Sequence, residues 1–304
     1  MSSKLIGHRE LFKDFVNFYN LGKLPNKILL SGHKGIGKSV FSSHFLNYIF
    51  SKEEEYPYDL ENNEILERNK SYNLYFNNVH PNIFKIQKNV EKKNIEIEQI
   101  RNMIKFQNSS SFNNKERFVL IDDAEFLNIN STNALLKSIE EPNSNLNFII
   151  IHDSNVKIKE TLKSRCIEFK LYLKSSEIEF IIDSYFKNSI YSKISEDFKT
   201  HYNNPSFLIN FIKFCNDKEI DFENVSINEF IKILIDNKNY IKENFVLENL
   251  NFFIELFFYR NSNLVKNYSY DLKEYFYQKL SNVKKYNLDL ESFFIEFEDV
   301  LINE

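Results

Sequence analysis

The chain has 304 residues, of which 42% are hydrophobic, so it is long enough to form two or three domains with cores of their own. Its formal net charge of −4 excludes a basic field over the whole surface, so a contact with nucleic acid would have to come from a local patch or from partner subunits. The two cysteines, Cys166 and Cys215, lack the spacing of a zinc site, and no long apolar segment follows Met1. We therefore expect a cytoplasmic protein with no membrane span and no zinc site built from cysteines.

The most informative motif is a phosphate-binding loop (P-loop) at residues 32–39, GHKGIGKS, which matches the pattern G-x-x-x-x-G-K-[ST]. In this pattern glycines let backbone N–H groups turn toward phosphate, the lysine serves phosphate oxygens, and the hydroxyl serves Mg²⁺. A mostly apolar run at 27–30 precedes the loop and a helical pattern at 40–50 follows it, as the motif requires. The alternative is a glycine turn that holds no ligand. The predicted nucleotide-binding residues are Gly32, Gly35, Ile36, Gly37, Lys38 and Ser39.

Beyond the P-loop helix, residues 51–78 are acidic and carry few apolar side chains. We expect a solvated helix or an excursion from the sheet there, and we give it no function. Apolar runs suited to buried strands alternate with helical patterns along the first 170 or so residues, which predicts a parallel sheet covered on both faces. The predicted strands are residues 28–30, 83–86, 118–121, 148–151 and 167–169.

The strand at 118–121 ends at Asp122, as a Walker B strand does when it places a carboxylate near the Mg²⁺ of a P-loop. A strand that ends in aspartate is common, and the upstream Lys38 and Ser39 are what favour a magnesium ligand here. The next residue is Asp123, at a position where ATPases of this type usually have a glutamate that polarises the attacking water. Because aspartate is one methylene shorter, we predict a degenerate catalytic position.

The strand at 147–151 is followed by His152 and Asp153, where a side chain could sense the nucleotide. His152 could equally be a residue at the end of a strand with its hydrogen bonds satisfied. After Leu173 the strand patterns stop, and helical segments continue to Glu304 with a break at 203–206. We predict three domains: a P-loop nucleotide-binding domain at 1–172, a small helical lid domain at 173–208, and a helical C-terminal domain at 209–304.

The motifs taken together resemble those of one family. In chain order they are the P-loop, IDDAEFLN at 121–128, NALLK at 133–137, EEP at 140–142 and SRC at 164–166. Their order is similar to that of the clamp-loader branch of the AAA+ ATPases, and within it most similar to the delta-prime subunits of bacterial DNA polymerase III. The segments LIGH at 5–8, GKLP at 22–25 and HPN at 80–82 add to the resemblance, which is close over residues 5–172.

This resemblance implies an AAA+ domain, a lid and a helical collar domain that oligomerises in a ring of five subunits. It implies ATP or ADP with Mg as the ligand, held through Ser39 and Asp122. The implied partners are gamma/tau and delta subunits, the sliding clamp and, through the assembled ring, primed DNA. It also implies that Arg165 reaches the ATP site of a neighbouring subunit as an arginine finger, where its fixed fork and permanent charge pair with phosphate oxygens. The alternative is a surface arginine in an intramolecular ion pair.

The chain departs from the family pattern in three places. It lacks the cysteine cluster that binds structural zinc in many relatives, so no zinc is expected. Residues 204–207 lack the sensor arginine of motor subunits, and Asp123 replaces the water-activating glutamate. These departures favour a subunit that braces the ring, holds a nucleotide and hydrolyses it poorly, over a gamma/tau motor subunit. A stand-alone P-loop phosphotransferase would leave SRC at 164–166 and the long helical part unexplained.

Overall fold

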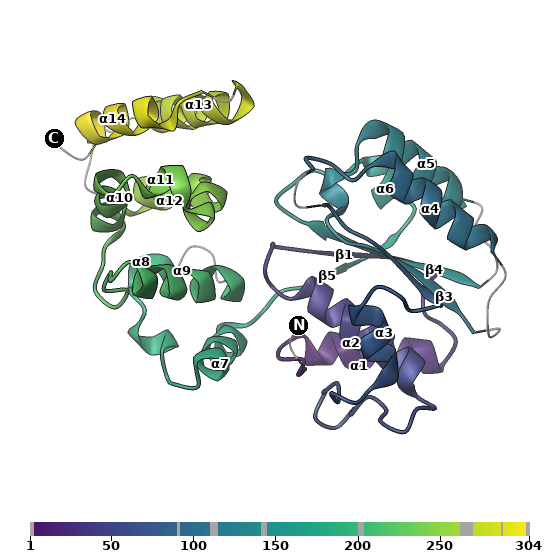
Figure 1. Cartoon of the computed structure of the whole chain (residues 1–304). Helices are drawn as coiled ribbons and strands as arrows, with labels where there is room; N and C mark the ends of the chain where they lie inside the picture. Colours follow the sequence, from purple (N-terminus) through teal and green to yellow (C-terminus); the bar gives the residue numbers. More distant parts are fainter. Residues whose placement is uncertain are drawn as a thin grey trace. The chain divides into compact units, whose positions relative to one another are not determined.

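The computed structural model describes residues 3–89, 92–109, 115–140, 145–199, 204–261, 270–286 and 288–301. The chain divides into two compact units, Met1–Ile181 and Ile182–Glu304. The first unit is an α/β domain and the second is helical (Figure 1).

The first unit is built on a five-stranded sheet in the order β2-β3-β4-β1-β5, and every neighbouring pair is parallel. The strands are β1 (Lys27–Gly32), β2 (Ile83–Ile86), β3 (Arg117–Ile121), β4 (Leu146–Asp153) and β5 (Ile167–Lys170). All five predicted strands are present. The predicted fold class, a parallel α/β domain followed by helical regions, is confirmed.

Helices cover both faces of this sheet (Figure 1). One face carries α1 (Arg9–Asn20), α2 (Lys38–Ser51) and α3 (Lys70–Phe76), and the other carries α4 (Ile97–Asn108), α5 (Ile129–Glu140) and α6 (Glu160–Lys163). Successive strand residues point to opposite faces, so Ile28 and Leu30 of β1 join the core under α1 and α2, whereas Leu29 joins the core under α4 and α5. Such two-sided burial is why these strands read as continuous apolar runs.

The carboxyl ends of the parallel strands share one edge of the sheet. At this edge β1 runs into the P-loop and α2, β3 runs into a short 3₁₀ helix, η1 (Ala124–Phe126), and β4 ends at Asp153. Because β1 lies next to β4, and β4 next to β3, residues that follow these three strands meet in space. The sheet topology therefore positions the candidate site.

The acidic segment 51–78 is an excursion that folds onto the first unit. Its helix α3 is capped from a distance, because the Glu54 carboxylate accepts hydrogen bonds from the backbone N–H groups of Lys70 (2.9 Å) and Ser71 (3.0 Å). The side chains of Tyr58 and Ile65 are buried in the core. The segment is thus an excursion that packs on the core under α1 and α2, and its function stays unassigned.

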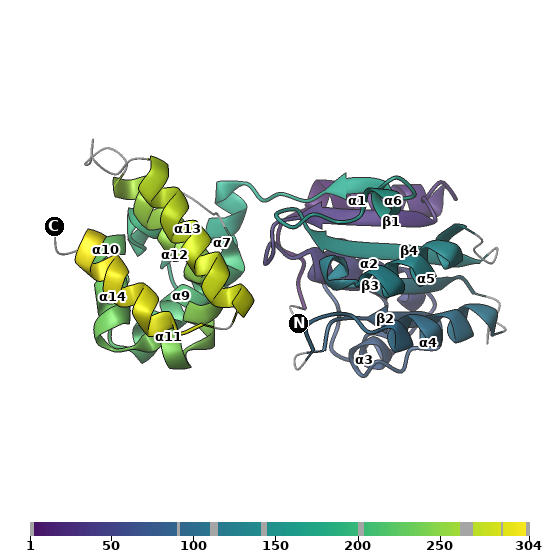
Figure 2. The same ribbon diagram turned by 90° about the horizontal axis from the view of Figure 1, so that it is seen from above.

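The second unit is helical throughout its described residues. Helix α7 (Ser175–Phe186) spans the division between the units, and residue 208, the predicted lid boundary, lies inside α9. The three-domain division stays a prediction. The further helices are η2 (Tyr191–Lys193), α8 (Glu196–Lys199), α9 (Pro205–Asp217), α10 (Ile227–Asp236), α11 (Asn239–Lys242), α12 (Asn244–Asn261), α13 (Tyr270–Tyr286) and α14 (Leu290–Leu301), of which the last two lie side by side (Figure 2).

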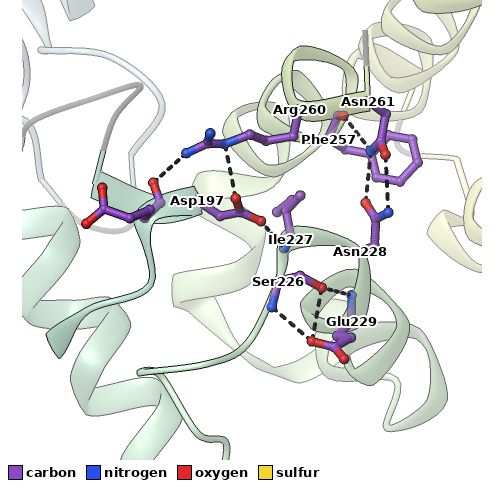
Figure 3. Close-up of polar contacts among 9 residues, drawn as sticks. Asp197, Ser226, Ile227, Asn228, Glu229, Phe257, Arg260 and Asn261 are labelled. Atoms are coloured by element: carbon purple, nitrogen blue, oxygen red, sulfur yellow. Dashed lines mark hydrogen bonds and ion pairs between the residues drawn. The ribbon is translucent and has the colours of Figure 1, made fainter. Parts of the chain in front are cut away.

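Polar contacts join α8, α10 and α12 (Figure 3). The Asp197 carboxylate accepts a hydrogen bond from the N–H of Ile227 at 2.9 Å and pairs with Arg260 at 3.2 Å. Asn228 and Asn261 exchange amide hydrogen bonds across 33 residues of sequence, at 3.2 and 2.9 Å. These contacts fix the first turn of α10 and the last turn of α12 relative to each other.

Candidate nucleotide-binding site

The P-loop turns sharply between β1 and α2. Gly35 and Gly37 have φ values of 87° and 97°, in the left-handed region that favours glycine. Gly37 is the N-cap of α2, and no side chain caps the helix there. The N–H groups of the first helical turn, together with the helix dipole, therefore suit a phosphate group.

The lysine of the motif is folded against its own loop. Lys38 is 7% exposed, and its Nζ donates hydrogen bonds to the carbonyl oxygens of Gly32 (2.6 Å) and His33 (2.8 Å). Burial lowers the pKa of Lys38, and the nearby carboxylates, with Asp153 and Glu125 foremost, act in the opposite direction. The amine therefore lies in an acidic environment in which a bound phosphate could take the place of the two carbonyl oxygens.

The predicted magnesium ligands lie together. The Ser39 hydroxyl, in the first turn of α2, donates to the Asp122 carboxylate after β3 at 2.6 Å. Mg²⁺ prefers oxygen ligands and is usually held by one or two protein groups plus phosphate oxygens and waters. This pair of oxygens beside the phosphate-binding loop fits a nucleotide-bound Mg²⁺.

Asp123 occupies the predicted water-activating position in a constrained conformation. Its φ of 58° is left-handed, and its N–H donates to the Asp122 carboxylate at 3.0 Å. Burial raises the pKa of Asp123, and the adjacent charges of Asp122 and Glu125 raise it further. The structure brings Asp123 to the site but surrounds it with other carboxylates.

Two features of this edge were not predicted from the sequence. Glu125 of η1 accepts a hydrogen bond from the N–H of Asp153 at 3.2 Å, which ties the end of β3 to the end of β4 near Lys38. The sequence does contain a signal for Glu125, because it is the third acidic residue within four positions after β3. His8, which contacts the P-loop, was noted only as part of the LIGH segment.

His152 lies on β4 opposite Ser31 of β1 and is 6% exposed. Its Nδ1 has no hydrogen-bond partner among the described residues. Burial lowers the pKa of His152, and the charge of Lys38 adds to this effect. The Nδ1 of His152 therefore does not fit the interpretation of a residue with all its hydrogen bonds satisfied. A role for His152 in sensing the nucleotide stays a prediction.

Arg165 is engaged within its own unit. Its Nε donates to the Glu140 carboxylate at 2.7 Å and an outer nitrogen donates to the carbonyl of Thr161 at 2.8 Å. The Arg165 and Glu140 side chains are 36% and 48% exposed, so the pair lies at the surface. Of the EEP segment, Glu141 and Pro142 lie outside the described residues.

Comparison with known proteins decides the family. The model of the family described as DNA polymerase III, delta subunit, matches residues 7–174, which is more than half of the chain. The chain belongs to this family. The predicted resemblance to the delta-prime subunits of the DNA polymerase III clamp-loader family is confirmed.

Relatives of both types are similar to the chain. The DNA polymerase III subunit delta' of Pseudomonas aeruginosa is 28% identical over 140 residues, which are 46% of this chain and 41% of the relative. The subunit delta' of Buchnera aphidicola subsp. Baizongia pistaciae is 26% identical over 252 residues, 78% of this chain and 70% of the relative. The subunit gamma of Buchnera aphidicola subsp. Schizaphis graminum is 27% identical over 188 residues, 57% and 46% respectively. The match thus spans less than half the length of the Pseudomonas and gamma relatives.

Within the described ranges, none of the helices combines the length and apolar character needed to span a bilayer. Over the same residues, no group of three or more His, Cys, Asp or Glu side chains is placed to hold a metal ion together.

Proposed function

We propose that this chain is a delta-prime type subunit that braces the clamp-loader ring, holds a nucleotide with little turnover, and lends Arg165 to the ATPase site of a neighbour. The observation that carries the proposal is the intact Ser39–Asp122 pair beside an Asp123 that stands where glutamate is expected. The groups that bind phosphate and Mg²⁺ are present, whereas the group that polarises water is shortened.

The nucleotide would be ATP or ADP with Mg²⁺, and the metal ion would neutralise phosphate charge. The N–H groups of the P-loop and of the first turn of α2 bind the phosphates. Lys38 exchanges its carbonyl partners for phosphate oxygens, and Ser39 with Asp122 holds the metal ion. Asp123 is too short and too close to other carboxylates to activate water well, so hydrolysis is slow.

The proposed role of Arg165 is compatible with its ion pair to Glu140. An exposed ion pair contributes only about 0.2–1 kcal/mol. A guanidinium group can leave such a pair for phosphate oxygens that carry more charge. In this proposal Arg165 pairs with Glu140 in the free subunit and with the nucleotide of the neighbouring subunit in the assembled ring.

Assembly with gamma/tau and delta subunits, and through the ring with the sliding clamp and primed DNA, is part of the same proposal. The helical unit supports it with large apolar side chains that are about half exposed, among them Tyr259 at 52% and Ile295 at 55%. Side chains of this kind are often buried in partner subunits. The test is purification of the full chain with the gamma and delta subunits of its own organism. A stoichiometric complex is expected, and a chain that stays monomeric would overturn the proposal.

The similarity to the Buchnera gamma subunit supports a second candidate, a gamma-type subunit. The two types are separated by nucleotide chemistry. We expect calorimetry to detect Mg·ADP binding by the isolated protein, its loss in Lys38→Ala, and very slow ATP turnover. Rapid hydrolysis that Lys38→Ala abolishes would favour the gamma type, and phosphate transfer to a small molecule by the lone chain would favour a phosphotransferase.

A further inference from the structure

His8 is a buried residue that contacts the P-loop from outside the motif. Gly7 and His8 both have left-handed backbone conformations, with φ of 81° and 54°, so the chain turns sharply just before α1. His8 is 8% exposed, and its Nε2 lies 2.8 Å from the carbonyl oxygen of Ile36. Since a carbonyl oxygen only accepts, Nε2 carries the proton and donates it to the loop. The ring also meets Phe41 of α2 edge-on, with centroids 6.3 Å apart.

The segment that leaves β5 for α7, residues 171–174, packs against the same structures and is called the linker below. The N–H of Leu171 donates to the carbonyl of Ser31 at 2.8 Å, at the start of the P-loop. A Cβ atom added at Gly32 would lie 2.6 Å from the carbonyl oxygen of Leu171. One added at Gly7 would lie 2.4 Å from the side chain of Leu173. Linker, P-loop and the N-terminal turn are therefore in contact without room for another atom.

Groups of both segments act on the His8 ring. Burial lowers the pKa of His8, while hydrogen bonding to the backbone of Ile36, the charge of Glu177 and hydrogen bonding to the backbone of Tyr172 act in the opposite direction. Glu177 lies in the first turn of α7, where its carboxylate accepts from the N–H of Lys174 at 2.9 Å. His8 thus contacts the loop that would bind phosphate, and the adjoining Gly7 lies against Leu173 of the linker and Glu177 in the first turn of the helix that follows it.

We propose that His8 is a positioning residue that couples the P-loop to the linker, so that binding of a nucleoside diphosphate or triphosphate changes the conformational freedom of residues 171–174. The proposal rests on the nucleotide site proposed above and adds a route by which its occupancy is reported to the helical part of the chain.

The coupling follows from the contacts. Phosphate binding orders the P-loop, and the Ile36 carbonyl is fixed to His8 as part of that loop. The loop is hydrogen-bonded to His8 through Ile36, and the linker is hydrogen-bonded to the start of the loop through Leu171. Ordering of the loop therefore restricts the linker. Coupling between two sites is reciprocal, so a looser linker must also weaken nucleotide binding by the same factor.

The test is hydrogen exchange of peptides that cover residues 32–37 and 171–174 in the full chain, with and without Mg·ADP. The wild type is expected to exchange more slowly in both segments when Mg·ADP is bound. His8→Phe keeps an aromatic ring of similar size but removes the donor. It should keep slower exchange in the P-loop, lose the response of the linker, and bind Mg·ADP roughly 5-fold more weakly, at the low end of typical couplings.

Three controls separate this role from a merely structural one. His8→Gln restores a side-chain N–H donor and should restore both the linker response and the affinity. His80→Asn changes another buried histidine, away from the linker, and should leave both unchanged. A linker that responds in His8→Phe as in the wild type, or does not respond in a wild type that binds Mg·ADP, would overturn the coupling alone. A folded wild type that binds no Mg·ADP would overturn the proposed site, and the coupling with it.

Discussion

Arg117 is a buried cation whose partners are backbone carbonyl groups. It is 5% exposed at the start of β3, and its guanidinium donates to the carbonyl oxygens of Phe106 (2.8 Å), Gln107 (3.1 Å) and Ser109 (2.8 Å). These carbonyls end α4, where a positive charge is favourable. A single side chain therefore donates to three carbonyl groups at the end of α4.

We predict that Arg117→Met lowers the free energy of unfolding by about 2–4 kcal/mol, because it removes three hydrogen bonds donated by a buried charged group. The measurement is urea unfolding of the full chain. Arg101→Met is the matched control, since Arg101 is 62% exposed in its ion pair with Glu98. The control should cost less than about 0.5 kcal/mol, and equal losses in the two variants would contradict this account of Arg117.

His80 gives the fold a dependence on pH. It is 8% exposed, its Nδ1 accepts from the N–H of Asn82 at 3.2 Å, and its ring packs on Phe50 with centroids 4.7 Å apart. Burial lowers its pKa from 6.5 to about 4, against the charge of Glu54. Because the folded pKa lies below the unfolded one, this contribution to stability is present above pH 6.5 and is lost as the pH falls toward 4.

We predict that the wild type loses more stability than His80→Asn between pH 7 and pH 5, by on the order of 1 kcal/mol after allowance for solvent screening. Asparagine keeps an acceptor near the Nδ1 position but does not titrate. Urea midpoints at the two pH values measure the difference. Parallel losses in both proteins would show that His80 is not the titrating group.

At the scale of elements, α10 depends on a capping box. The Ser226 hydroxyl accepts from the N–H of Glu229 at 3.2 Å, and the Glu229 carboxylate accepts from the N–H of Ser226 at 3.0 Å (Figure 3). The Ser226 bonds hold the pKa of Glu229 below its usual value. The helix start is thereby defined locally, within four residues.

We predict that Ser226→Ala lowers stability by about 1 kcal/mol and that Ser226→Thr, which keeps the hydroxyl, loses much less. Thermal unfolding followed by circular dichroism measures both. If alanine and threonine were equally tolerated, the cap would not be what fixes the start of α10.

These elements show what local sequence can predict. The strands and the P-loop are predictable because strand burial and glycine spacing leave signals within a few positions. The capping of α3 by Glu54, and the Asn228–Asn261 pair, join residues that are 16 and 33 positions apart. Such contacts depend on how helices pack, and no local pattern encodes them.

At the scale of the whole molecule, the sheet explains why the core of the site was predictable and its surroundings were not. Ser39 and Asp122 were predicted as a pair because parallel strands end at a common edge. The position of β1 between β4 and β5 was not predicted, and this order brings Asp153, and with it Glu125, next to the loop. The contact of His8 with Ile36 depends in addition on a left-handed turn at a non-glycine residue, which sequence patterns rarely reveal.

In the proposed function, Arg165 acts in the ATPase site of a neighbouring subunit. The direct measurement is single-turnover ATP hydrolysis at each site of the reconstituted complex, with Arg165→Ala in this chain. Lys163→Ala is the matched control, because Lys163 is an exposed cation of α6 that pairs with Glu168 at 3.2 Å. Glu140→Gln, which removes the charge that pairs with Arg165 and keeps its bond to the Thr161 carbonyl, should leave the rates unchanged.

We predict that Arg165→Ala assembles normally and binds nucleotide at its own P-loop, because an exposed ion pair contributes little to stability. Hydrolysis at one neighbouring site should fall by up to roughly 10³-fold, the scale on which arginine fingers act, and the other sites should keep their rates. Unchanged rates at every site of a complex shown to be assembled would contradict the account and leave Arg165 as the structural partner of Glu140.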